Sequence, residues 1–352
     1  MIKVGNLMES VYIRATSTAN AMDVQPTCTV IGGGLAGLLA ADTMIRLGCK
    51  ATILEKAKGV GGRMATRRMG GQTFDFGAQS LFGRTPKFQS MLESWKHAGL
   101  IAEWHPDLSA RVREKKHPGP YFKGNPAMTS VPKYLAEGLT VHLQTRVTAV
   151  RTVDAAWSVE TEHNHIFMSQ ALIMTAPVPQ SLALLEAGGY EPDRNALAEL
   201  RSVEYTSCFA LMLALDGPSG LPAPGAMTLD GEPLAWISDN YAKGVAARPG
   251  AVTVCASEAF SNEMLEVHPE RITQILLDAV RPMIHAHVES TQLHRWRYSR
   301  PVRTLQSSFL VADTKPPLLF AGDMFGDGDC ESAALSGTAA AEFLHSTFCP
   351  TR

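Results

Sequence analysis

A glycine-rich turn near the start of the chain places the strongest constraint on its fold. Residues 32–37 read GGGLAG and match the spacing G-x-G-x-x-G. The preceding residues 27–31 form a short β-prone run, residues 35–48 carry a broad apolar helical face, and residues 51–54 form a second apolar strand. A strand, this turn, a helix and a second strand predict a βαβ unit of about 30 residues with parallel strands and a right-handed crossover.

The three glycines of this spacing have separate tasks in a dinucleotide-binding turn. Gly32 permits the tight turn, Gly34 lets the backbone approach a pyrophosphate, and Gly37 allows the helix to pack closely on the strand. The first amides of the helix donate to the phosphates. Glu55 ends the second strand, where a carboxylate accepts hydrogen bonds from ribose hydroxyls. The predicted contacts at this end of a dinucleotide are Gly32, Gly34, Leu35, Ala36, Gly37, Glu55 and Lys56.

Strand and helix patterns continue along the rest of the chain. Strands are predicted at residues 140–151, 156–160, 171–175, 208–215, 251–257 and 318–322, and helices at 269–285 and 332–348. We expect strands 208–215 and 251–257 in the centre of a second sheet. Nucleotide-domain patterns lie at both ends of the chain with different material between them, so we expect one domain inserted into the other.

The predicted fold class is therefore α/β, with a Rossmann-like cofactor-binding domain and an inserted substrate domain of mixed sheet plus helices. A length of 352 residues is typical of two domains. The predicted division assigns 24–90, 136–180 and 300–352 to the cofactor domain, 91–135 and 181–299 to the substrate domain, and 1–23 to a disordered or non-native extension.

Composition excludes several classes of function. A net charge of −2 argues against a nucleic-acid partner. No apolar run approaches the length of a membrane span, about 18 residues, so no membrane association is predicted. Six scattered cysteines without a CxxC pair are typical of reduced thiols, which predicts a cytoplasmic protein. The histidine pairs at 163/165 and 285/287 lack a third ligand, so no metal site is predicted.

A second glycine-rich loop indicates which dinucleotide is bound. Residues 59–63 read GVGGR, and the guanidinium of Arg63 is placed to contact phosphates. The order GxGxxG, acidic residue, GGR resembles the flavin amine oxidase superfamily. Residues 318–323, LLFAGD, resemble the strand of that superfamily whose closing Gly-Asp binds the ribityl and pyrophosphate region.

This resemblance implies FAD as the cofactor, held without a covalent bond because no cysteine lies near Trp296. It also implies that Asp323 accepts a ribityl hydroxyl and that the helix following residue 328 directs its first amides at the flavin pyrimidine edge. The active-site lysine of amine oxidases has no clear counterpart in the sequence. The further contacts implied for the cofactor are Gly62, Arg63, Met64, Ala78, Gln79, Val147, Gly322, Asp323, Glu331, Ala333 and Ala334.

Finer pieces of the sequence resemble the renalases within that superfamily. These pieces are residues 62–68, 74–80, 124–130, 135–139 and 294–298. The resemblance implies an oxidase that converts 2- or 6-dihydro-NAD(P) to NAD(P)⁺ by hydride transfer to the flavin, with O₂ as the electron acceptor and H₂O₂ as the product. An amine oxidase or another small-molecule FAD oxidoreductase is a second reading, and a non-catalytic FAD-binding protein is a third.

The catalytic residues are not identified by the sequence, but four side chains are candidates for the substrate pocket. Trp296 and Tyr298 alternate on a predicted strand, and His294 shares their parity, so all three are expected on one face. Gln79 follows Gly77 and Ala78, where the superfamily backbone passes the isoalloxazine ring. Ordinary sheet packing is the competing interpretation for Trp296 and Tyr298, a structural role is that for His294, and a plain loop position is that for Gln79.

Overall fold

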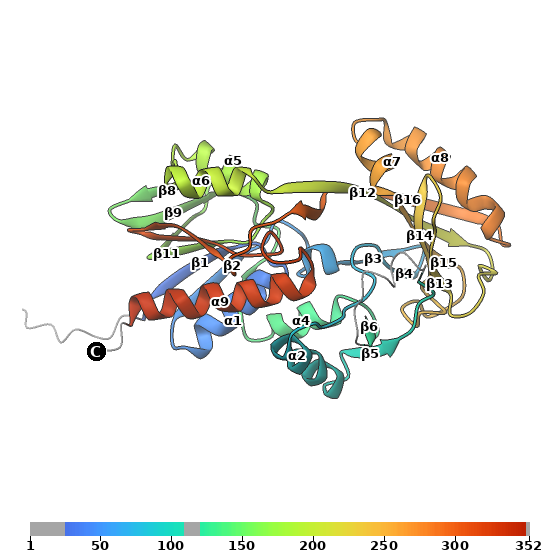
Figure 1. Ribbon diagram of the computed structural model, residues 1–352, viewed down its shortest axis with the longest axis horizontal. Helices are drawn as coiled ribbons and strands as arrows, with labels where there is room; N and C mark the ends of the chain where they lie inside the picture. The colour runs from blue at the N-terminus through green and yellow to red at the C-terminus, as the bar shows by residue number, and fades with distance from the viewer. Residues whose placement is uncertain (1–24, 109–119, 350–352) are drawn as a thin grey trace, which may run out of the picture.

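The computed structural model describes residues 25–108 and 120–349, so the predicted extension 1–23 lies outside the described residues. The molecule is elongated and has two parts (Figure 1). One part is built on a largely parallel sheet and the other on an antiparallel sheet. The long strands β12 (Glu204–Leu215) and β16 (Val288–Arg303) run from one part to the other.

The first sheet has the strand order β17-β18-β11-β1-β2-β7 and is parallel except for β17. Its strands are β1 (Thr27–Ile31), β2 (Lys50–Leu54), β7 (Thr140–His142), β11 (Ala171–Met174), β17 (Leu310–Thr314) and β18 (Pro317–Phe320). Val30, Ile53, Ile173 and Leu319 are fully buried in its centre. The strands predicted at 27–31, 51–54, 171–175 and 318–322 are confirmed.

Helices α1 (Leu35–Arg46) and α9 (Cys330–Phe348) cover one face of this sheet (Figure 1). The two helices cross so closely at Gly337 that a Cβ there would lie 2.2 Å from the carbonyl oxygen of Ala36. The opposite face packs on the sheet of β8 (Val147–Val153), β9 (Ala156–Thr161) and β10 (Ile166–Ser169), and on helices α5 (Val178–Ala187) and α6 (Arg194–Arg201). The arrangement confirms the predicted α/β class with a Rossmann-like parallel sheet.

The single strand predicted at 140–151 is wrong. The chain forms β7, turns, and then forms β8 in a different sheet. Gln144 adopts a left-handed conformation with φ of 52°, and the amides of Gln144 and Thr145 donate to the carbonyls of Ala57 and Glu55. Residues that directly follow β2 therefore fix this turn. The sequence around the turn does not reveal these hydrogen bonds.

The second large sheet is antiparallel throughout, in the order β13-β14-β15-β12-β16. Its remaining strands are β13 (Ala226–Thr228), β14 (Leu234–Asp239) and β15 (Ala251–Ala256). The central positions predicted for 208–215 and 251–257 are confirmed. Helices α7 (Glu258–Glu263) and α8 (Pro269–Val280) pack on one face. The helix predicted at 269–285 ends at Val280 and continues as the 3₁₀ turn η2 (Arg281–Met283), because Pro282 lacks the N–H that a helix interior needs.

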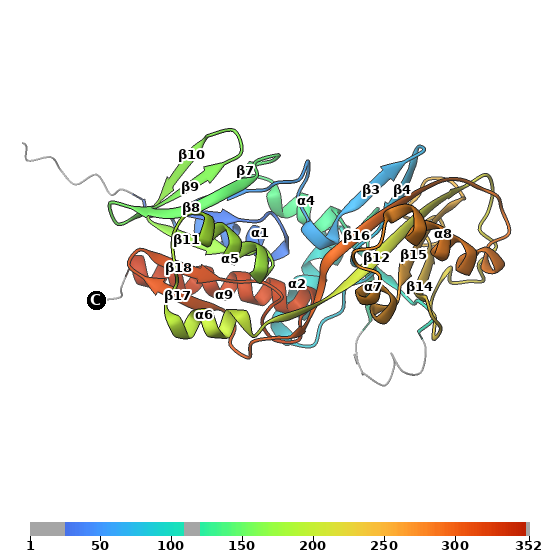
Figure 2. The ribbon, with the colours of Figure 1, turned by 90° about the horizontal axis from the view of Figure 1, so that it is seen from above.

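A hairpin of β3 (Thr66–Met69) and β4 (Gln72–Asp75) lies beside β12 and β16 at the junction of the two parts (Figure 2). Phe74 and Phe76 pack there on Ala210 and Met212 of β12. The remaining elements at this junction are the 3₁₀ turn η1 (Gly62–Met64), α2 (Pro86–His97), β5 (Ile101–Trp104), β6 (Tyr121–Gly124) and α4 (Ser130–Ala136).

The domain boundaries stay a prediction. Helices α5 and α6 fall almost wholly within the predicted substrate segment 181–299, and their Leu185 and Leu200 pack in one core with Ile31 and Leu54 of the parallel sheet. In the part of the chain that the structure describes, no helix combines the length and apolar character of a membrane span.

Candidate functional site

The turn between β1 and α1 leaves an open cradle at the start of the helix. Gly34 precedes α1 and provides no side-chain cap, so the amides of the first turn keep free donors. A Cβ on Gly34 would meet no atom within 4 Å, whereas a Cβ on Gly37 would lie 2.0 Å from the carbonyl oxygen of Gly32. The glycine at 37 is therefore required by packing, and the space over Gly34 fits a phosphate bound at the positive end of the helix.

The Glu55 carboxylate is held at the edge of this cradle. Its Oε2 accepts from the amide of Gly33 at 2.7 Å and its Oε1 from the amide of Ala57 at 2.7 Å, and the residue is buried. Lys56 donates to Gln180, and burial lowers the pKa of its ammonium group. Val147 begins β8 as a buried residue just past this turn. The placement of Glu55 agrees with the geometry expected for a ribose contact, which stays a prediction.

Arg63 and Asp323 bring together the two ends of the sequence pattern. Arg63 Nη1 lies 2.6 Å from Asp323 Oδ2, and Nη2 donates to Oδ1 at 2.7 Å. Nη1 also lies 3.4 Å from the carbonyl oxygen of Tyr298. Burial opposes the charge on Arg63, but Asp323 outweighs it and raises the pKa of the guanidinium. A bidentate pair at this position fixes both groups predicted to face the flavin diphosphate and ribityl chain.

The loop after β4 is tied to the second glycine-rich loop. The amide of Ala78 donates to the carbonyl of Arg63 at 2.8 Å, and a Cβ at Gly77 would lie 2.0 Å from that same oxygen. Met64 is buried beneath this contact. The Gln79 side chain turns inward: its Nε2 donates to the carbonyls of Asp75 and Gly77 at 2.9 and 3.1 Å. In the described structure Gln79 therefore positions the loop predicted to border the flavin.

Sequence reasoning missed Lys243, which lies at the centre of this region. Its side chain is fully buried, with Nζ 3.0 Å from Asp75 Oδ2 and 3.3 Å from Gln79 Oε1. The ammonium group also lies 4.9 Å from the centroid of a Trp104 ring. Because burying an unpaired charge is costly, the ion pair with Asp75 is what permits this placement. The sequence YAKG around Lys243 looks like an ordinary surface turn, and no local signal marks it.

The strand candidates form two groups. Phe76 stacks on Trp296 with ring centroids 5.1 Å apart, and His294 meets both rings edge-on at 4.9 and 4.2 Å. Trp296 Nε1 donates to the carbonyl of Phe76 at 2.9 Å. Tyr298 instead packs on Tyr205, at a centroid distance of 5.5 Å, on the side of Arg63. Burial, with a smaller contribution from Arg67, lowers the pKa of His294 to about 4, so its ring is neutral at pH 7.

The start of α9 is closed by its own side chains. Asp329 caps the helix by accepting from the amide of Ser332 at 3.0 Å. The buried Glu331 carboxylate accepts from the amides of Arg84 and Thr85, both at 2.8 Å. Ala333 is half-buried, and Ala334 is buried in a cluster with Leu35 at the start of α1. Glu331 therefore anchors the turn before α2, and its predicted contact with a cofactor stays a prediction.

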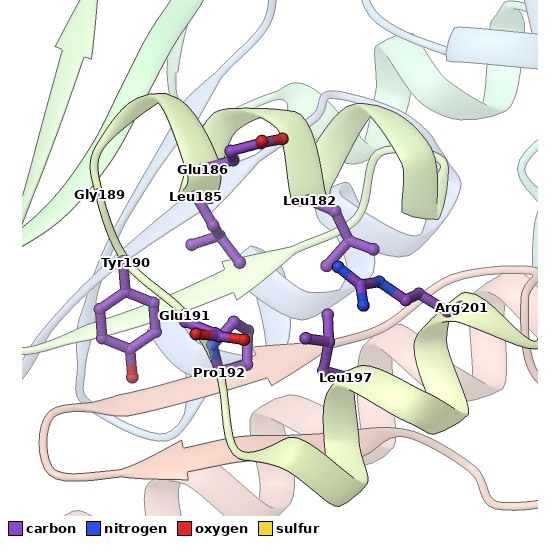
Figure 3. Close-up of a pocket in the computed structure, with 9 residues that line it drawn as sticks. All are labelled: Leu182, Leu185, Glu186, Gly189, Tyr190, Glu191, Pro192, Leu197 and Arg201. Atoms are coloured by element: carbon purple, nitrogen blue, oxygen red, sulfur yellow. The ribbon is translucent and has the colours of Figure 1, made fainter.

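A hollow of about 350 Å³ lies elsewhere, between α5 and α6 (Figure 3). Leu182, Leu185 and Leu197 face one another between the two helices, with Tyr190 and Arg201 at its sides. None of the predicted site residues lines it. The hollow is therefore separate from the cradle, from the Arg63–Asp323 pair and from the aromatic group, which consists of Phe76, His294 and Trp296.

Comparison with known proteins agrees with the geometry. Residues 30–95 match the family model of an NAD(P)-binding Rossmann-like domain, and residues 97–344 match that of flavin containing amine oxidoreductases. Renalase of Mus musculus is 25% identical over 332 residues, which cover 87% of this chain and 96% of that protein.

Two solved structures share the fold at 13% identity. A chain from Exiguobacterium sp. 255-15 named for a protoporphyrinogen oxidase gives a TM-score of 0.71, and a triple mutant of putrescine oxidase gives 0.65. Each comparison covers 91% of this chain and 98% of the other. Together with the family match over most of the chain, these findings show that the protein is a flavin-dependent oxidoreductase and belongs to the flavin-containing amine oxidoreductase family.

Proposed function

We propose that the protein is a renalase-like oxidase with non-covalent FAD. In this proposal a 2- or 6-dihydro isomer of NAD(P)H loses a hydride and becomes NAD(P)⁺, and O₂ takes up that hydride and one proton to give H₂O₂. FAD supplies the hydride acceptor and the reaction with oxygen. The observation that carries the proposal is the likeness to renalase, which extends over 87% of this chain and 96% of that protein.

The described residues support FAD rather than a mononucleotide. The open cradle at Gly34 and the carboxylate of Glu55 provide an anion site and a ribose site at one end. The Arg63–Asp323 pair, formed between the second glycine-rich loop and the Gly-Asp that follows β18, provides a further polar site. A dinucleotide spanning the two would have its diphosphate near the α1 amides and its ribityl chain near Asp323.

The aromatic group supports a flat heteroaromatic substrate. Phe76, His294 and Trp296 lie next to the backbone of residues 77–78, so an aromatic surface borders the segment predicted to meet the flavin. Hydride loss from a dihydronicotinamide restores an aromatic ring, so it needs no strong acid or base. The side chains found here fit that requirement: His294 is neutral, and Lys243 and Arg63 are each paired with a carboxylate.

The decisive experiment is anaerobic reduction of the purified yellow protein. We expect 6-dihydro-NAD or 2-dihydro-NAD to bleach the flavin band within seconds, and ordinary NADH and a panel of primary amines to bleach it far more slowly. Admission of air should restore the band and yield one H₂O₂ for each NAD⁺. Bleaching by an amine alone would assign the protein to the amine oxidases, and the absence of bleaching by any of these reductants would overturn the proposed oxidase.

A further inference from the structure

Arg67 differs from Arg63 and Lys243 in forming no ion pair with a carboxylate of the described residues. It lies on β3 opposite Phe74 of β4, so the two side chains share the face of the hairpin that packs on β12. Its guanidinium lies over the Phe76 ring, 4.8 Å from the centroid, and is half-buried. Within residues 25–108 and 120–349, no hydrogen bond or ion pair is formed by this guanidinium. None of its five donors is therefore paired within these residues.

No carboxylate in the described part of the chain forms an ion pair with this positive charge. Arg63 is neutralised by Asp323 and Lys243 by Asp75, both at hydrogen-bond distance. His294, the titratable member of the aromatic group, is neutral at pH 7. A guanidinium that rests on an aromatic ring and keeps its donor edge free is a favourable site for a phosphate or carboxylate.

The position of Arg67 relates this site to the substrate rather than to the cofactor phosphates. Phe76, on which it rests, stacks on Trp296 and directly precedes Gly77 and Ala78, the backbone predicted to border the flavin ring. The predicted phosphate contacts of FAD lie instead at Gly34 and Arg63. An anion at Arg67 would thus belong to a molecule whose ring stacks on the aromatic group.

We propose that Arg67 binds the phosphate of the reducing substrate, and so selects a phosphorylated dihydronicotinamide over its uncharged riboside. The inference rests on the proposed function and deepens it by naming the residue that recognises the charged part of the substrate. Arg68 provides a matched control, because it is the next residue on β3, carries the same charge and is exposed on the opposite face of the hairpin.

The test compares two probes on the flavin-loaded full-length protein. Nicotinamide mononucleotide and nicotinamide riboside, which differ by the phosphate, are titrated by calorimetry into the parent protein, Arg67→Met, Arg67→Lys and Arg68→Met. We expect Arg67→Met to weaken mononucleotide binding by about 10- to 100-fold, the usual size of a lost charge-assisted hydrogen bond. Riboside binding should change by less than about 3-fold. Arg67→Lys should keep most of the mononucleotide affinity, and Arg68→Met should keep all of it.

The outcomes separate this inference from the proposed function. If Arg67→Met weakens both probes equally, or neither, while the parent protein binds both and is bleached by 6-dihydro-NAD, phosphate recognition by Arg67 is wrong and the oxidase proposal stands. If the parent protein binds neither probe and no dihydronicotinamide bleaches it, the proposed function fails and the inference fails with it. An unchanged flavin content in Arg67→Met shows that the variant is folded.

Discussion

The guanidinium of Arg63 and the carboxylate of Asp323 form a bidentate ion pair, although 260 positions separate them in the chain. Arg63 comes from the turn after β2 and Asp323 from the end of β18. The pair therefore joins the first and last segments of the cofactor region. Both side chains are largely withdrawn from solvent, so each supports the orientation of the other.

Asp323→Asn should lower flavin binding. The amide cannot hold Arg63 by two charge-assisted hydrogen bonds, and it is a weaker acceptor for a ribityl hydroxyl. We expect about a 10-fold higher Kd when FAD is titrated into the apoprotein. Asp327→Asn is the control, since Asp327 is an exposed partner of Arg84. Equal affinity of the two variants for FAD would contradict a role for Asp323 in binding.

Gly34→Ala and Gly37→Ala should separate binding from folding. The added methyl group at 34 meets open space, so the unfolding free energy of the apoprotein should change by less than about 0.5 kcal/mol. The same methyl group should obstruct the phosphate and lower flavin content. At 37 the methyl group would overlap the carbonyl of Gly32, so we expect a loss of at least about 2 kcal/mol. Urea unfolding measures the change in stability, and the flavin-to-protein absorbance ratio measures the flavin content. A normal flavin content in Gly34→Ala would contradict phosphate binding at the cradle.

Lys243→Met should destabilise the protein by about 3–5 kcal/mol, because it leaves the Asp75 carboxylate buried without its cation. The double variant Lys243→Met/Asp75→Asn should recover part of this loss, since the uncompensated charge is gone. Denaturant unfolding of the single and double variants measures the coupling between the two residues. Strictly additive effects would show that the pair contributes no interaction of its own.

His294 should make stability fall at acidic pH. Its pKa is about 4 in the folded protein and about 6.5 in the unfolded chain, so below pH 6.5 the unfolded state binds a proton that the native state does not. This contribution is complete above pH 6.5 and is lost as the pH falls towards 4. Because the ring is only partly buried, we expect a loss of about 1–2 kcal/mol. His294→Gln should remove this part of the pH dependence of Tm, whereas exposed His163→Gln should leave it intact.

Three contacts that no sequence pattern carries hold together the segments predicted to bind the flavin and the substrate. The carbonyl of Arg63 receives the amide of Ala78, the carbonyl of Phe76 receives the Trp296 indole, and Gln79 donates to Asp75. The first two contacts join separate segments of the chain, and the third folds the loop after β4 back on itself. The same parity placed His294 and Trp296 in one cluster as predicted, but it did not reveal that Tyr298 packs on Tyr205.

By itself, the sequence determined the βαβ unit, its glycine turn, the closing Gly-Asp strand and the central strands of the second sheet, because these features depend on local glycine requirements and on apolar periodicity. Only the tertiary structure decided that 140–151 is two strands, that Lys243 is buried on Asp75, and that Arg67 lies over Phe76. Those outcomes depend on which segments meet in space. Burial and ion pairing are properties of such meetings and leave no trace in the neighbouring residues of the chain.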